Sequence, residues 1–212
     1  SIPGSTRKIY PKTKNQAKLI QSFRKNDMVF ATGPAGSGKT FLAVAESLRL
    51  LLSHKISSII LVRPIVEAGE SLGFLPGDMR EKLDPYLQPL YDALRDMLSS
   101  QRLERLIEDR TIEIAPLAFM RGRTLDNAFV ILDEAQNSTA TQLKMFLTRM
   151  GRNSKFIITG DSTQVDLPKN QTSGLIPTVE KLKHIKEISI VNLTCSDIVR
   201  HSLVTKIVEA LD

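Results

Sequence analysis

Eight consecutive residues combine glycine, lysine and threonine in an order that suits phosphate binding. They read Gly33-Pro34-Ala35-Gly36-Ser37-Gly38-Lys39-Thr40 and match G-x-x-x-x-G-K-[ST] at every fixed position. Glycines let the backbone curl so that several N–H groups face one point, and a following helix adds partial positive charge. Lys39 would reach the β- and γ-phosphates, and the Thr40 hydroxyl would complete one magnesium ligand position. We expect Phe41, which follows directly, to belong to the nucleotide-binding residues as well. The pattern predicts a P-loop that binds ATP with magnesium.

Two carboxylates end an apolar run further along the chain. Residues 129–132 read Phe-Val-Ile-Leu, and Asp133 and Glu134 follow directly, which is the Walker B pattern. Buried carboxylates need a partner, and a bound magnesium ion supplies one, so we expect Asp133 to hold the metal through water. We expect Glu134 to polarise the attacking water, which favours hydrolysis over phosphoryl transfer to another acceptor. The alternative, a strand end that merely faces solvent, is disfavoured beside a complete P-loop.

A third polar cluster, Gly160-Asp161-Ser162-Thr163-Gln164, follows another apolar run. At the carboxyl end of a parallel strand this cluster would face the γ-phosphate. Gln164 could then sense the phosphate or orient water. An ordinary Gly-Asp turn is the competing interpretation.

Composition sets the limits within which these motifs work. The chain has 212 residues, 42% of them hydrophobic, enough for one sizeable core. A formal net charge of +6 allows an acidic partner but equally an ordinary basic surface. Cys195 is the only cysteine, which fits a reducing cytosol, and His54, His184 and His201 show no metal-ligand spacing. No apolar run reaches membrane-spanning length, so we expect no membrane partner.

Short apolar runs alternate with amphipathic segments along the chain. Strands are expected at 28–32, 58–62, 111–115, 128–132, 155–159 and 187–193, and helices at 13–24, 39–53, 85–100, 101–108, 140–151 and 197–211. We expect Gly151 to cap the helix at 140–151. Residues 1–10 would be a flexible lead-in and 11–212 one domain, with an insertion at 66–110 that starts in a Gly-rich stretch. The alternation predicts an α/β fold with a doubly wound, mostly parallel sheet flanked by helices.

Several segments resemble known families. Asp133-Glu134-Ala135-Gln136 and the cluster at 160–164 look like motifs of superfamily 1 helicases, and Asn15-Gln16 resembles their adenine-reading Q motif. The P-loop and five further segments are similar to the PhoH-like proteins over nearly the whole chain. These segments are Arg63-Pro64, 72–78, 85–92, 120–125 and 197–201.

The resemblance implies a cytoplasmic P-loop ATPase with a RecA-like core, linked to phosphate starvation by name, to RNA metabolism by association and to hexameric rings. It implies that Gln16 contacts adenine and that Gly36, Gly38, Lys39 and Thr40 hold phosphates and magnesium. Gln164 would couple to the γ-phosphate. Arg200 would be an arginine finger, in cis or from a neighbouring subunit, although a solvated charge on the last helix is the alternative.

The chain departs from larger relatives in two ways. They carry an N-terminal region resembling nucleic-acid-binding domains or a fused nuclease, and superfamily 1 helicases have a second RecA domain, which a ring could replace. Arg121 and Arg123 could contact a phosphate backbone, face ATP across a subunit boundary or point into water. Tyr86 and Tyr91 could stack on bases, although core packing or a subunit contact is favoured.

Three functions follow from these patterns. The first is an oligomeric ATPase that acts on RNA or another single-stranded nucleic acid, as a remodelling motor or helicase. The second is a nucleotide-dependent switch that recruits a protein partner such as a nuclease. The third is a small-molecule kinase, for which no acceptor-site signature is visible.

Overall fold

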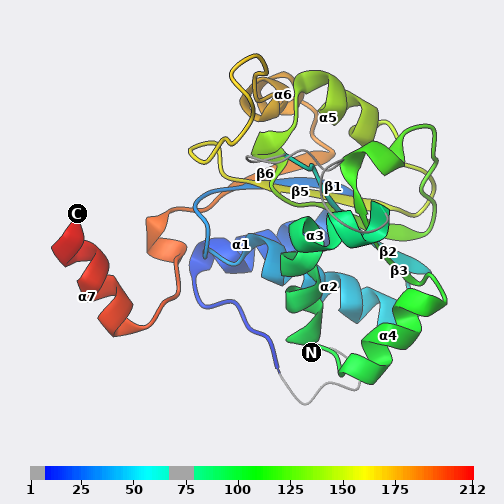
Figure 1. Cartoon of the computed structure of the whole chain (residues 1–212), viewed down its shortest axis with the longest axis horizontal. Coiled ribbons are helices and arrows are strands. Elements are labelled where there is room, and N and C mark those ends of the chain that lie inside the picture. Colours follow the sequence, from blue (N-terminus) through cyan, green and yellow to red (C-terminus); the bar gives the residue numbers. More distant parts are fainter. Residues whose placement is uncertain (1–7, 67–78) are drawn as a thin grey trace.

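The computed structural model describes residues 8–66 and 79–212, and for residues 79–84 it describes the backbone alone (Figure 1). Most of the expected lead-in at 1–10, and the Gly-rich stretch at 67–78, lie outside the described residues. Within the described part of the chain, every helix is too short or too polar to cross a lipid bilayer.

A parallel sheet forms the centre of the molecule. Its described strands are β1 (Met28–Thr32), β2 (Ser58–Arg63), β3 (Ile112–Pro116), β4 (Ala128–Leu132), β5 (Lys155–Gly160) and β6 (Ile188–Asn192). They lie in the order β3-β2-β4-β5-β1-β6, and every described pairing is parallel. The predicted doubly wound parallel α/β fold is confirmed. Because all six strands run the same way, their carboxyl ends lie at one edge of the sheet.

Helices cover both faces of this sheet (Figure 1). One face carries α1 (Lys14–Lys25), α2 (Lys39–Leu52), α3 (Met79–Arg95) and α4 (Ser100–Glu108), and the other carries α5 (Ala140–Leu147) and α6 (Leu175–Leu182). The region 66–110, expected as an insertion, contributes α3 and α4 to the first face. The last helix, α7 (Ser202–Leu211), stands away from the body of the molecule and buries no residue.

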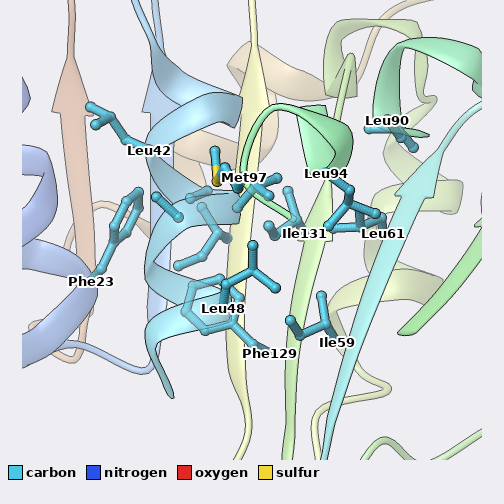
Figure 2. Close-up of a cluster of buried hydrophobic side chains, with 14 of the residues drawn as sticks. Phe23, Leu42, Leu48, Ile59, Leu61, Leu90, Leu94, Met97, Phe129 and Ile131 are labelled. Carbon is cyan, nitrogen blue, oxygen red and sulfur yellow. The ribbon is translucent and has the colours of Figure 1, made fainter. Parts of the chain in front are cut away.

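The larger apolar core lies between the sheet and helices α1 to α4 (Figure 2). Phe23 of α1 meets Phe129 of β4 edge to face, with ring centroids 6.4 Å apart. Leu48 of α2 and Leu94 of α3 are fully buried in the same cluster. Alternate residues of the same strands point to the opposite face and pack against α5 and α6. The strands are therefore apolar on both sides, as parallel strands under two helical layers must be.

The structure corrects four helix boundaries. The helix predicted at 140–151 ends at Leu147, and Gly151 is not its cap, because its N–H donates instead to the Leu125 carbonyl near the start of β4. The helix predicted at 197–211 starts at Ser202, where the His201 side chain accepts from the Leu203 N–H. Helix α3 starts six residues before the expected 85 and ends at Arg95, five residues before the expected 100. Helix α6 lies in a stretch where we expected no helix.

Candidate active site

The P-loop connects β1 to α2 at the carboxyl edge of the sheet. Gly33, Gly36 and Gly38 have φ of 145°, 81° and 90°, a backbone region that favours glycine. A Cβ on Gly33 would lie 2.6 Å from the Leu193 carbonyl oxygen, so no larger residue fits there. Gly38 caps α2 with no side-chain hydrogen bond, which leaves the first N–H groups of that helix available to an anion.

Lys39 lies folded back over the loop. Its Nζ donates to the carbonyl oxygens of Gly33 at 2.7 Å and Pro34 at 2.8 Å. Burial holds the pKa of Lys39 below its ordinary value, while the nearby carboxylates of Asp161, Glu134 and Asp133 act in the opposite direction. The lysine is therefore a buried cation whose present acceptors are uncharged oxygens, the Gly33 and Pro34 carbonyls and, at 3.4 Å, the Ser37 hydroxyl. A phosphate oxygen would be a stronger acceptor for it.

Asp133 follows β4 and faces the start of α2. Its Oδ1 accepts from the Thr40 hydroxyl at 2.7 Å and from the Thr159 hydroxyl at 3.2 Å. The Asp133 Oδ2 accepts from the Arg63 guanidinium of the neighbouring strand. The predicted metal-binding pair of Thr40 and Asp133 is thus in direct contact across 93 residues of sequence.

Glu134 adopts a left-handed backbone, with φ 54° and ψ 41°, immediately after Asp133. Its carboxylate accepts from the Gln136 side-chain amide at 2.5 Å. The other end of that amide, Gln136 Oε1, accepts from the Asp161 N–H at 3.1 Å. Gln136 therefore fixes the Glu134 carboxylate relative to the loop after β5. A strained backbone held by its surroundings is common where a side chain must be aimed at a reacting group.

The loop after β5 completes the site. Asp161 is buried, and its Oδ2 has no hydrogen-bond partner among the described residues. Gln164 is exposed and lines the same cavity as Lys39 and Glu134, and its carbonyl accepts from the Gln136 amide at 3.3 Å. A buried carboxylate oxygen without a donor is a place where water or a ligand hydroxyl can bind.

A loop-support cluster, made of Asn15, Gln16 and Asp197, contacts the P-loop at the Ser37 carbonyl. Gln16 is buried, and its amide donates to the Ser37 carbonyl at 3.0 Å and to the Asp197 carbonyl at 3.4 Å. The Asn15 amide donates to the Asp197 carboxylate at 2.9 Å. Burial would raise the pKa of Asp197, but hydrogen bonds from Thr13, Thr194 and Asn15 outweigh it and place the pKa below its ordinary value. Contact of Gln16 with adenine stays a prediction.

Other predicted residues lie apart from this cavity. Arg200 is exposed between the short 3-10 turn Cys195–Asp197 and α7, and it does not line the cavity within the described structure. Arg123 pairs with Glu113 at 2.8 Å, whereas Arg121 is exposed. Tyr91 packs against the core beside the Arg95 guanidinium, which lies 6.0 Å from the ring centroid.

The residues present fit a magnesium nucleotide. No group of three or more His, Cys, Asp or Glu side chains among the described residues could hold a metal ion by itself. Magnesium is commonly held by one or two protein oxygens together with substrate phosphates, and the Thr40 hydroxyl and the Asp133 carboxylate supply that kind of oxygen. The metal and the phosphates would therefore bind together.

Comparison with known proteins agrees with the motifs. The sequence model of the family described as PhoH-like protein matches residues 8–212. The chain belongs to the PhoH-like protein family. It is 60% identical over 201 residues to a PhoH-like protein of Bacillus subtilis (strain 168), covering 95% of this chain and 63% of that protein. It is 43% identical over 201 residues to Protein PhoH of Escherichia coli (strain K12), covering 93% of this chain and 57% of that protein.

These PhoH-like relatives are longer than the chain, which spans about three fifths of their length. Among solved structures, the large terminase from a thermophilic bacteriophage has a TM-score of 0.57 at 13% identity. The match covers 96% of this chain and 51% of the terminase chain. At that identity the likeness shows a shared fold, a parallel sheet with helices on both faces, and the P-loop lies at the carboxyl edge of that sheet here.

Five residues of the site were missed as candidates, Thr159 at the end of β5 among them. Gln136 and Asp161 lie within the two quoted motifs, at 133–136 and 160–164, so their membership of those motifs was a usable signal. Arg63 also lies in a quoted segment, but nothing in its sequence neighbourhood indicates contact with Asp133. The role of Asp197 could not be predicted, because it depends on the C-terminal segment lying beside the P-loop in the folded chain.

Proposed function

We propose that this PhoH-like chain binds ATP with magnesium and hydrolyses it to ADP and phosphate. One observation carries the proposal: Lys39, Thr40, Asp133, Glu134 and Gln164 line one cavity of about 290 Å³ at the carboxyl edge of the sheet. A buried lysine, a metal-binding oxygen pair and a second carboxylate in one cavity are the parts that phosphoryl transfer to water needs.

The mechanism assigns one role to each group. Lys39 and the P-loop N–H groups bind the phosphates, and Lys39 leaves the Gly33 and Pro34 carbonyls to do so. Thr40 and Asp133 would hold magnesium, which would neutralise charge on the phosphate oxygens. Glu134 accepts a hydrogen bond from the attacking water and orients it in line with the γ-phosphoryl group. Gln136 keeps the Glu134 carboxylate pointed at that position.

We further propose that the active form is an oligomer. Leu203, Val204, Ile207, Val208 and Leu211 make one apolar face of α7, and each is between 37% and 81% exposed. Helix α7 follows β6 at one edge of the sheet, whereas an apolar groove beside β3 lies at the opposite edge. Copies joined head to tail through these two surfaces would form a ring or a filament. In such an assembly, a neighbouring copy would bring its Arg200 to the nucleotide cavity that contains Lys39 and Glu134.

Single-stranded nucleic acid, RNA in the first instance, is the proposed partner of that oligomer. The support is the formal charge of +6 and the exposed Arg121 on the loop before β4. A nucleotide-controlled switch that recruits a nuclease is the second candidate. It is favoured by α7, because this helix buries no residue and its apolar face is available to a partner protein.

The test is phosphate release from magnesium ATP, measured with and without single-stranded RNA and DNA at low salt. Lys39→Ala serves as the loss control, and light scattering on the same samples gives the mass. We expect Lys39-dependent turnover that rises with nucleic acid and a mass above that of one chain. Turnover that ignores both nucleic acids would favour the switch, and release equal to that of Lys39→Ala would reject the ATPase proposal.

A double variant tests the oligomer separately. Leu203→Ser with Ile207→Ser makes the α7 face polar without touching a buried residue. We expect the mass by light scattering to fall to one chain while the circular dichroism spectrum stays that of a folded protein, because both changed side chains are exposed and such changes rarely exceed ~0.5 kcal/mol each. An unchanged mass would exclude α7 as the contact.

A further inference from the structure

Arg63 holds the carboxylate that the proposed function gives to magnesium. It ends β2, next to β4, and the Asp133 N–H continues the ladder between these strands by donating to the Val62 carbonyl at 2.8 Å. The Arg63 Nε and Nη2 both donate to Asp133 Oδ2, at 3.1 and 2.5 Å. The Arg63 Nη1 donates to the Tyr86 carbonyl of α3 at 3.3 Å. The guanidinium is thus fixed at three points.

These contacts occupy both oxygens of the Asp133 carboxylate. Thr40 and Thr159 donate to its Oδ1, and Arg63 donates twice to its Oδ2. The side chains of Arg63 and Asp133 are only 19% and 8% exposed, so water screens their interaction poorly. The arginine is therefore the cation that compensates this buried carboxylate.

A magnesium ion at the same carboxylate would be in conflict with this arrangement. Two cations held beside one buried carboxylate repel each other strongly where the local dielectric constant is low. The Oδ2 lone pairs taken by Arg63 are also those that a metal-bound water would need. The arginine must give up part of its contact with Asp133 when magnesium nucleotide binds.

The same cavity offers Arg63 another acceptor. Among the described residues, Arg63 is the one arginine that lines the cavity shared by Lys39, Glu134 and Gln164. The γ-phosphoryl oxygens would lie in that cavity, and a planar guanidinium binds phosphate oxygens with two parallel hydrogen bonds.

We propose that Arg63 is a phosphate-binding residue that exchanges partners when magnesium ATP binds. It competes with magnesium for Asp133 before the nucleotide binds, and it passes to the γ-phosphoryl oxygens once magnesium ATP is in place. This inference rests on the proposed ATPase function. It gives the chain an arginine in its own cavity, in addition to any arginine that a neighbouring copy brings.

The first experiment measures magnesium dependence without any turnover. Binding of N-methylanthraniloyl-ADP is followed by fluorescence while magnesium is titrated, for wild type, Arg63→Gln and Arg49→Gln. Arg63→Gln should lower the half-saturating magnesium concentration at least about tenfold, because two charged hydrogen bonds no longer compete for Asp133. Arg49→Gln removes an arginine from its pair with the buried Glu46 carboxylate, outside the cavity, and should leave the half-saturating magnesium concentration unchanged.

The second experiment measures the contact with the γ-phosphoryl group. At saturating magnesium, the preference for a non-hydrolysable ATP analogue over ADP should fall about tenfold in Arg63→Gln. If Arg63→Gln fails to fold, Arg63→Lys takes its place, because lysine keeps the charge but loses the two-point contact. An unchanged or higher half-saturating magnesium concentration, with an unchanged preference, would overturn the proposal. Failure of wild type to bind the nucleotide would instead reject the proposed function.

Discussion

Replacement of Glu134 by glutamine separates hydrolysis from nucleotide binding. Glu134 is half-buried, and its carboxylate accepts from the Gln136 amide. A glutamine has the same size, and its amide oxygen can accept that same hydrogen bond. Because the left-handed backbone at 134 is occupied by an unbranched residue in both proteins, the change brings little new strain. We therefore expect Glu134→Gln to fold like wild type.

The expected loss of turnover follows from the proposed role of the Glu134 carboxylate as a general base. A positioned general base contributes about 10²- to 10⁴-fold, and the amide cannot take a proton from water. Phosphate release should fall by that factor, which corresponds to about 3–5 kcal/mol in the activation barrier. Glu134 makes no hydrogen bond to Lys39 or Thr40 among the described contacts. Nucleotide affinity should therefore be retained or rise, because the change removes a negative charge from the cavity that would hold the phosphates.

The assay compares phosphate release from magnesium ATP with the dissociation constant of N-methylanthraniloyl-ADP, on the same preparation. Glu134→Asp is the matched control, since it keeps the charge but shortens the side chain by one methylene. Turnover of Glu134→Gln within about threefold of wild type would refute the assignment of Glu134 as the base. Parallel loss of binding and turnover would show that the carboxylate supports the site and does not act in the chemical step.

Three further changes test packing and backbone geometry. Gly151→Ala places a Cβ 1.9 Å from the Asp126 Oδ1, so the free energy of urea unfolding should fall by about 1–3 kcal/mol while nucleotide binding persists; an unchanged value would contradict the geometry. Phe129→Ala removes a fully buried ring that meets Phe23 edge to face, and should cost about 3–5 kcal/mol in chemical denaturation; a loss below about 1 kcal/mol would contradict that packing. Glu134→Gly should melt about 2–4 °C above Glu134→Ala in calorimetry, because glycine tolerates a φ of 54° and alanine does not; the reverse order would argue against strain there.

Local signals were enough for the strands and for the phosphate loop. The runs at 28–32 and 128–132 are short, apolar and bounded by polar residues, and β1 and β4 have those same limits. The P-loop is specified within eight residues, because its turn, its lysine and its helix start are neighbours in sequence. The start of α1 was also readable, because the helix expected at 13–24 begins at Thr13, whose side chain caps α1, and capping acts over three residues.

Contacts that depend on the order of the strands in the sheet could not be predicted from local sequence. Arg63 and Asp133 are 70 residues apart and meet because β2 happens to lie beside β4 in the sheet. Predicted helix ends were wrong where tertiary contacts outweigh helix propensity. Gly151 is an example, because its N–H donates to the Leu125 carbonyl near β4. Helix α6 carries a proline, Pro177, in its first turn and is only eight residues long, so its amphipathic pattern was too brief to recognise.

The loop-support cluster has a consequence for the order in which the protein can be assembled. Gln16 and Asn15 reach Asp197 across 181 and 182 residues, so this support exists only once nearly the whole domain has been synthesised. Contacts at such separation are entropically costly to close and form late in folding. A growing chain would expose its complete phosphate-binding sequence long before that sequence was held in shape. Nucleotide binding by ribosome-bound chains of increasing length should therefore begin only after the segment that contains Asp197 has left the exit tunnel.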